Sequence, residues 1–194
     1  MIRWLQMDSK LPEITKLENI IKNCTKCPLH KSRIQAVPGH GNPKAKLVFI
    51  GEAPGRYEDE QGLPFVGKSG KLLDFMLSQI KMERKDVWIG NIVKCRPPAN
   101  RDPTPKEIET CKPYLTEQLR LLNPKVIATL GRFSMNYFLP EAKISQIHGK
   151  PQILKSSQGK FILYPLYHPA AGLRNGKIKL ALIEDFLKIP KLLK

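Results

Sequence analysis

Four cysteines are the most reactive set of side chains in the chain, and their spacing is typical of a metal centre. Cys24 and Cys27 form a C-x-x-C pair, while Cys95 and Cys111 follow singly, each near prolines in segments expected to be loops. Four thiolates suit Zn²⁺ and an iron–sulfur cluster about equally in charge and softness. The second C-x-x-C pair of a zinc ribbon is missing, which tilts the expectation towards a [4Fe–4S] cluster. For Cys95, which follows the apolar Ile92 and Val93, an unpaired core cysteine is the alternative.

Disulfides are not expected, because residues 1–10 lack the pattern of a secretory signal peptide. No apolar run approaches the roughly 20 residues of a membrane span, so the sequence predicts a soluble, cytoplasmic protein without a membrane partner. A chain of 194 residues that is 41% hydrophobic is long and apolar enough for a single domain covering residues 1–194.

The charge balance indicates a polyanionic partner. Lys and Arg number 33 against 17 Asp and Glu, a formal net charge of +16. Each phosphate that a cation neutralises releases counterions, so such an excess favours nucleic-acid binding. A Lys-rich thermophile proteome is the alternative, but it would enrich Glu as well. Nucleic acid is therefore the expected partner.

The next candidates stand in a Gly- and Pro-rich loop directly after a buried run. Glu52 is a single carboxylate between glycines and prolines, in a segment that lacks the G-x-x-x-x-G-K-[ST] pattern of a phosphate loop. Phe65, near the end of the same loop, is either a core residue or a stacking platform.

Two further polar residues follow other expected strands. Asn91 is either a turn residue or an amide that reads a base edge. His168 is a lone histidine, a type that is more often structural than catalytic. It shares the expected sheet edge with Glu52 and Asn91, where the active sites of parallel sheets gather.

The pattern of apolar residues predicts a three-layer α/β/α sandwich with a central, mostly parallel four-stranded sheet. Ser69 and Thr104 are the expected starts of the second and third helices, and residues 139–159 should hold a hairpin or an irregular link. The expected strands are 46–51, 87–93, 125–131 and 160–169, and the expected helices are 11–22, 69–81, 105–122 and 177–189.

Three segments, GEAPGRYEDEQGLPFVGKSG (51–70), NIVKCRPPANRDPTPKEIETC (91–111) and HPAAGLR (168–174), carry a family resemblance. Together they resemble the signatures of the family 4 uracil-DNA glycosylases, the iron–sulfur branch of that superfamily from thermophilic bacteria and archaea. The resemblance covers roughly residues 15–188. It implies a structural [4Fe–4S] cluster held by Cys24, Cys27, Cys95 and Cys111, and so decides the metal that spacing left open.

The resemblance also implies a repair activity and its residues. A monofunctional enzyme would flip uracil out of double- or single-stranded DNA and hydrolyse its N-glycosidic bond, leaving an abasic site. Phe65 would stack on the base and Asn91 would read it, while His168 would donate to uracil O2 as charge develops. Leu173 and Arg174 look like the wedge that fills the vacated stack.

One departure concerns the general base. Glycosylases of the first family carry GQDPYH, whose Asp assists the water. Here Ala53 occupies that slot and Glu52 takes the Gln position, so both are expected at the uracil and Glu52 is the candidate base. Glu58 and Asp59 are weaker candidates for the base, and Glu58 is expected, by analogy, to help exclude the thymine methyl. A solvated acidic loop is the alternative for both residues.

The remaining expectations concern partners and competing classes. The protein is expected to be a nucleoid-associated monomer, with a possible sliding-clamp contact through residues 1–8 or the basic tail with Lys188, Lys191 and Lys194. A non-catalytic Zn-Cys₄ module would leave the Glu52 loop and His168 unexplained. A helix-hairpin-helix glycosylase/lyase would cluster its cysteines as C-x6-C-x2-C-x5-C, which this chain does not.

Overall fold

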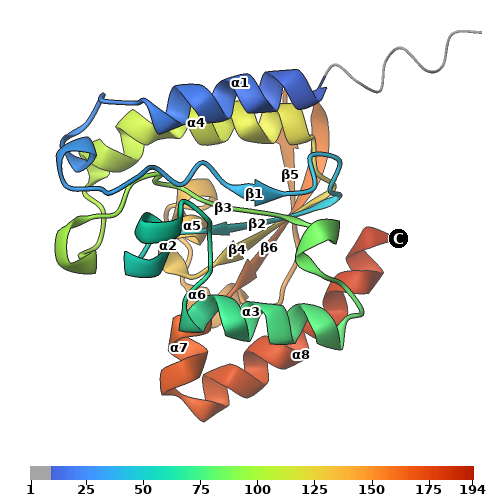
Figure 1. The fold of residues 1–194 in the computed structure, drawn as a ribbon. Helices are drawn as coiled ribbons and strands as arrows, with labels where there is room; N and C mark the ends of the chain where they lie inside the picture. The colour runs from blue at the N-terminus through green and yellow to red at the C-terminus, as the bar shows by residue number, and fades with distance from the viewer. Residues whose placement is uncertain (1–9) are drawn as a thin grey trace, which may run out of the picture.

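The computed structural model describes residues 10–194, and a mixed sheet runs through its centre (Figure 1). Residues 1–8, where a clamp contact was considered, lie outside the described residues. Within them the sheet has six strands in the order β1-β3-β2-β4-β6-β5. The strands are β1 (His40–Gly41), β2 (Leu47–Gly51), β3 (Trp88–Asn91), β4 (Val126–Leu130), β5 (Gln152–Ser156) and β6 (Gly159–Leu166).

The four predicted strands form the parallel centre of this sheet, β3-β2-β4-β6. The predicted strand number was two too low, because an antiparallel strand is added at each edge. β1 has only two residues, too few for an alternating pattern. β5 forms a hairpin with β6 inside the segment 139–159, where a hairpin or irregular link was expected.

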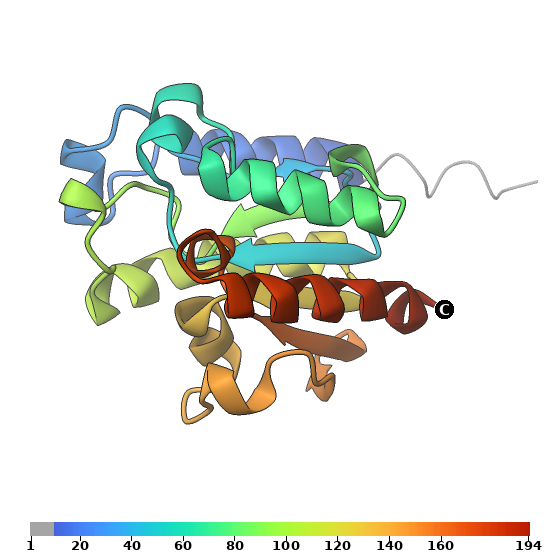
Figure 2. The same ribbon diagram turned by 90° about the horizontal axis from the view of Figure 1, so that it is seen from below.

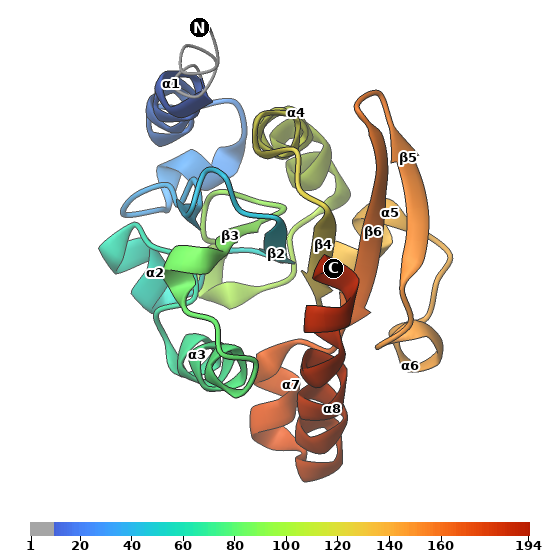
Figure 3. The same ribbon diagram turned by 90° about the vertical axis from the view of Figure 1, so that its right-hand side faces the viewer.

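Helices cover both faces of the sheet and make the predicted three layers (Figures 1 and 3). On one face lie α1 (Lys10–Lys22) and α4 (Pro105–Leu122), and on the other α3 (Lys68–Gln79) and α8 (Gly176–Leu193). Figure 2, the view from below, shows α3 and α8 side by side in front of the sheet. The shorter helices are α2 (Arg56–Gln61), α5 (Arg132–Phe138), α6 (Ile144–Ile147) and α7 (Pro169–Arg174), with 3-10 turns at Pro28–Lys31, Arg84–Asp86 and Pro98–Asn100.

The central strand β2 shows why the sheet needs cover on both sides. Val48 and Ile50 pack with α1 and α4, whereas Leu47 and Phe49 pack with α3 and α8. All five residues of the strand are buried. Successive side chains point to opposite faces, so a fully apolar strand requires two helical layers.

The two expected helix starts had different outcomes. Thr104 caps α4 as predicted: its hydroxyl accepts from the Glu107 N–H at 3.3 Å, and Glu107 reaches back to the Thr104 N–H at 2.8 Å. Ser69 was the wrong cap for α3, because that helix is capped by Gly67. The Glu58 carboxylate takes the N–H groups of Val66 and Gly67 and so starts the helix earlier.

Among the described helices, none combines the length and the apolar composition that crossing a membrane would need.

Candidate active site and cysteine cluster

The carboxyl ends of four adjacent parallel strands bring the predicted site residues into one cavity. Glu52 follows β2, Asn91 ends β3, Gly131 and Arg132 follow β4, and His168 stands two residues beyond β6. The register pairs Gly51 with Asn91 and Leu130 with Leu166, so these strands end level with one another. Ala53, Glu58 and Phe65 line the same cavity, as the sequence predicted. The sheet edge therefore builds the site.

Phe65 is held in an unusual backbone conformation beside His168. Its φ is +53°, a left-handed value that is uncommon for a bulky residue. Arg84 donates to the carbonyls of Pro64 and Phe65 and fixes this turn. The Phe65 ring lies 5.7 Å from the His168 ring, centroid to centroid, at 32°. The ring therefore combines both expected roles: it is buried in the core cluster with Leu47 and Phe49, and it also lines the cavity wall.

Gly51 makes room for this arrangement. A Cβ at Gly51 would lie 2.4 Å from Asn91 Oδ1 and 2.7 Å from Phe65 Cζ. Only a residue without a side chain allows the amide and the ring to approach the end of β2 together.

Asn91 presents an acceptor that has no partner. Its side chain is only 2% exposed, and Oδ1 is buried without a hydrogen bond in the structure. A buried polar atom left unpaired is costly, and in a cavity wall it marks a place for a ligand donor.

His168 is arranged as a neutral hydrogen-bond donor. It caps α7, and its Nδ1 accepts from the Ala170 N–H at 3.1 Å. Burial, aided by the charge of Arg174, lowers the pKa of His168 to about 4. At neutral pH the ring therefore carries its proton on Nε2, the nitrogen left free to donate.

Glu52 is tuned towards neutral pH by its surroundings. Burial and, to a smaller extent, the Asp102 carboxylate raise the pKa of Glu52 to about 7, against the opposing charge of Arg132. Arg132 Nη2 donates to Asp102 Oδ2 at 3.1 Å, and both residues line the cavity. Sequence reasoning missed Asp102 and Arg132, although Asp102 follows β3 and Arg132 follows β4, at the sheet edge where active sites gather.

Glu58 has a structural task. Its Oε2 accepts from the Gly55 N–H at 3.2 Å, and its Oε1 accepts from the N–H groups of Val66 and Gly67 at 2.8 and 2.9 Å. Both oxygens thus tie the loop that carries Phe65. The carboxylate still borders the cavity, so the predicted role against the thymine methyl stays a prediction.

The predicted wedge residues stand at the end of α7. Leu173 is 48% exposed, a large apolar side chain in solvent next to the cavity-lining Arg174. Arg174 Nε donates to the Ala170 carbonyl at 3.2 Å.

The four cysteines line one small pocket next to this site. Cys24 and Cys27 follow α1 and Cys95 follows β3, while Cys111 lies within α4 and not in a loop as expected. Pro113 did not break that helix. Backbone and guanidinium N–H groups approach three of the sulfurs: Lys26 N to Cys24 at 3.5 Å, Arg33 Nη1 to Cys95 at 2.9 Å and Lys94 N to Cys111 at 3.3 Å.

None of the cysteines is disulfide-bonded. Within residues 10–194, no three His, Cys, Asp or Glu side chains are arranged closely enough to hold a metal ion as they stand.

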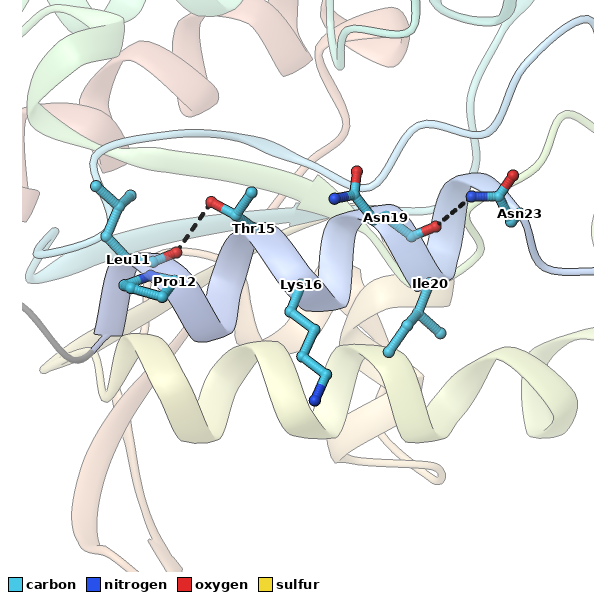
Figure 4. A pocket seen from close by; sticks show the side chains of 7 residues that line it. All are labelled: Leu11, Pro12, Thr15, Lys16, Asn19, Ile20 and Asn23. Atoms are coloured by element: carbon cyan, nitrogen blue, oxygen red, sulfur yellow. Dashed lines mark hydrogen bonds between the residues drawn. The ribbon is translucent and has the colours of Figure 1, made fainter.

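A second hollow lies on the outer side of α1 and carries no comparable chemistry (Figure 4). Two of its polar side chains bond back to helix carbonyls: Thr15 Oγ1 donates to the Leu11 carbonyl at 3.0 Å and Asn23 Nδ2 to the Asn19 carbonyl at 2.9 Å. It is therefore not a candidate for the active site.

The class of protein to which this sheet and its edge cavity belong follows from the sequence comparisons. The model of the uracil DNA glycosylase superfamily matches residues 38–189. The chain belongs to this superfamily.

Within the superfamily, several relatives at 40–47% identity are type-4 enzymes. The chain is 45% identical over 188 residues to the type-4 uracil-DNA glycosylase of Sulfurisphaera tokodaii, covering 94% of this chain and 86% of that protein. It is 47% identical over 177 residues to the type-4 enzyme of Archaeoglobus fulgidus, covering 89% of each. For the type-4 enzyme of Thermotoga maritima the identity is 40% over 178 residues, covering 90% and 91%. The predicted type-4 family is thereby confirmed, and the helix-hairpin-helix class is excluded.

Proposed function

We propose that the protein binds a uracil nucleotide extruded from DNA in the cavity at the strand ends and hydrolyses its N-glycosidic bond there. Family membership makes the protein a uracil-DNA glycosylase, a hydrolase of base-excision repair, as the sequence predicted. The proposal concerns how its residues perform this reaction. The observation that carries it is the unpartnered Asn91 Oδ1, buried in a cavity that also presents Phe65 and His168.

Asn91 and Phe65 would recognise the base. Uracil has a donor at N3 and an acceptor at O4, the complement of a side-chain amide. Asn91 Oδ1 would accept from N3–H, which gives the orphaned oxygen its missing partner. Cytosine presents an acceptor at N3, so two acceptors would face each other and that complex would lose affinity. The Phe65 ring would stack on the base.

His168 would stabilise the leaving group. Cleavage passes through a sugar with oxocarbenium character and leaves uracil with negative charge at O2. A neutral ring that already donates from Nε2 needs no proton from solvent before it can stabilise this charge. The hydrogen bond that the Ala170 N–H donates to His168 Nδ1 at 3.1 Å holds that tautomer and the orientation of the ring.

Glu52 would activate the water that attacks C1′. A general base works best with a pKa near the working pH, and the pKa of Glu52 is about 7. Its position directly after β2, level with Asn91, puts the carboxylate on the cavity side of the sheet edge. Ala53 beside it would contact the uracil without adding charge.

DNA would be held by charge and by a wedge. The formal net charge of +16 favours phosphate binding, and the exposed Leu173 beside Arg174 would occupy the space that the extruded nucleotide leaves. Both double- and single-stranded uracil-containing DNA are proposed as substrates.

The four cysteines would hold a structural [4Fe–4S] cluster. Four sulfurs around one pocket, with N–H donors directed at three of them, is the donor set that such a cluster uses. Cys24, Cys27, Cys95 and Cys111 would each supply one thiolate to it. Bound there, the cluster would supply covalent cross-links between the Cys24 segment, the loop after β3 and α4.

We further propose that residues 1–194 act as one domain and that the protein is a cytoplasmic, nucleoid-associated monomer. The two core clusters that share the central sheet support a single domain. A sliding-clamp contact of the basic tail stays a prediction.

Release of free uracil from a single-site oligonucleotide tests the proposed function. Wild-type protein should convert a U:G duplex and single-stranded uracil to abasic DNA, and an Asn91→Ala variant should bind the same DNA but release little uracil. Absorbance near 400 nm that dithionite bleaches would support the cluster and exclude zinc. Iron-loaded protein that leaves both substrates intact would refute the activity.

A further inference from the structure

Lys94 is the most deeply buried cation in the described part of the chain, and the mechanism above does not use it. Its side chain is 1% exposed, between Asn91 three residues before it and Cys95 directly after it. An ammonium group removed from water is strongly unfavourable without compensating hydrogen bonds or opposite charge. Its position therefore needs a physical reason.

The Lys94 side chain contacts Asn91, the residue that is proposed to read the base. Lys94 Nζ donates to the Asn91 carbonyl at 2.8 Å, a charge-assisted bond across a single turn of chain. The Trp88 ring lies 5.8 Å from Nζ, centroid to nitrogen, and covers the ammonium from the sheet side. These two contacts fix the last residue of β3, whose side chain carries the orphaned Oδ1.

Lys94 also contacts the cysteine cluster. Lys94 lines the same small pocket as the four cysteines. The Lys94 backbone N–H also donates to Cys111 Sγ at 3.3 Å, and its carbonyl accepts from the Val37 N–H at 2.7 Å. The same residue thus touches the cysteine cluster with its backbone and Asn91 with its side chain.

The charge of Lys94 connects Asn91 with the cysteine cluster. Four thiolates on an oxidised cubane core carry a net charge of −2, and this negative charge needs compensation in a buried site. Besides Lys94, Arg33 places a cation at the sulfurs, since its Nη1 donates to Cys95 at 2.9 Å. Arg33 Nη2 donates to the Lys22 carbonyl at 2.8 Å, away from Asn91. Of the two, only Lys94 bonds to Asn91.

We propose that Lys94 is a positioning residue that balances the charge of the cysteine centre and holds the backbone of Asn91, linking the cofactor site to base recognition. This inference rests on the proposed function. It gives the cofactor a specific contact with the reaction through one side chain, beyond cross-linking the loops.

Two charge-removing variants separate this link from a simple counter-charge. Lys94→Met keeps the length and apolar stem of the side chain, and Arg33→Gln is the matched control. Both should lower the reduction potential of the bound centre, because a nearby cation stabilises the reduced form. Only Lys94→Met should slow single-turnover uracil release, by at least about tenfold, since a bond from a charged donor is lost. DNA affinity should stay within about threefold in both.

The outcomes are distinct. Lys94→Met with normal uracil release would overturn the link to Asn91. If Arg33→Gln slows uracil release as much as Lys94→Met does, the centre acts on catalysis by another route. That result would also overturn the proposed link through Lys94. Wild-type protein that fails to release uracil would refute the proposed function instead, whatever the variants do.

A wild-type measurement keeps the inference testable if Lys94→Met does not fold. Coupling between two sites is reciprocal, so free uracil bound at Asn91 should shift the reduction potential of the centre. Uracil is uncharged, and therefore the field of DNA phosphates makes no contribution to such a shift. If free uracil binds to the wild-type protein through Asn91 but leaves the reduction potential of the centre unchanged, the proposal is overturned. The Asn91→Ala protein, measured at the same uracil concentration, gives the reduction potential without bound uracil.

Discussion

The rate of uracil release should follow the protonation state of Glu52. A general base must be deprotonated, and the pKa of Glu52 is raised to about 7 by burial and by Asp102, against Arg132. The value of kcat/KM should therefore rise with pH up to about 7 and level off above it. At pH 6 about one Glu52 in eleven is ionised, so the rate should be roughly tenfold below the plateau, and at pH 5 roughly a hundredfold. His168, with a pKa of about 4, stays neutral across this range.

Two variants of one ion pair sharpen this prediction. Asp102→Asn removes the carboxylate that raises the pKa of Glu52, so the acid limb should move to lower pH. Arg132→Gln removes the opposing cation, so the limb should move to higher pH. Both variants break the same 3.1 Å contact, Arg132 Nη2 to Asp102 Oδ2. A general loosening of the cavity would move both limbs in the same direction, whereas the electrostatic argument requires opposite shifts.

The assay measures initial rates of uracil release with limiting single-stranded oligonucleotide from pH 5 to 9, at one ionic strength, which reports kcat/KM of the free enzyme. Glu52→Gln should abolish the limb together with most of the activity. A flat profile in the wild type, or a limb that persists in Glu52→Gln, would refute the assignment of Glu52 as the base.

Three further variants test the rest of the site. His168→Ala should lower single-turnover release about 10²- to 10³-fold, the cost of one donor to a developing oxyanion, with DNA affinity nearly unchanged; equal loss of both would make His168 a binding residue. Gly51→Ala should lower release at least about tenfold, because its Cβ would lie 2.4 Å from Asn91 Oδ1, while Gly176→Ala, with nothing within 4 Å, should be neutral. Leu173→Ala should slow release from duplex more than from single-stranded DNA, since only the duplex has a stack to fill; equal slowing on both substrates would contradict the wedge.

Much of the site was predictable because parallel strands align their ends. Glu52, Asn91 and His168 each follow a buried run, and the rule that such ends share an edge places them in one cavity. The Thr104 cap was predictable for a similar reason, since its capping box is local in sequence.

What escaped prediction depends on contacts between distant segments. The Asp102–Arg132 pair joins residues 30 positions apart, and nothing local pairs them. Lys94 is polar and follows the apolar Ile92 and Val93, so the sequence gives no sign that its ammonium is buried. Ser69 lost its capping position to Glu58, whose carboxylate reaches 8 residues along the chain to Val66. The edge strand β1 is defined by its partner β3 and by no pattern of its own.

The order β3-β2-β4-β6 has a consequence for heat inactivation. Asn91, Glu52, Arg132 and His168 come from neighbouring strands whose spacing is set by backbone hydrogen-bond ladders in the core. Peripheral helices and the edge strands β1 and β5 can fray without moving these ladders, because opening at the edges costs less free energy than breaking the centre. The four site residues therefore separate only when the central sheet unfolds. Activity should be lost at the same temperature at which the whole fold melts.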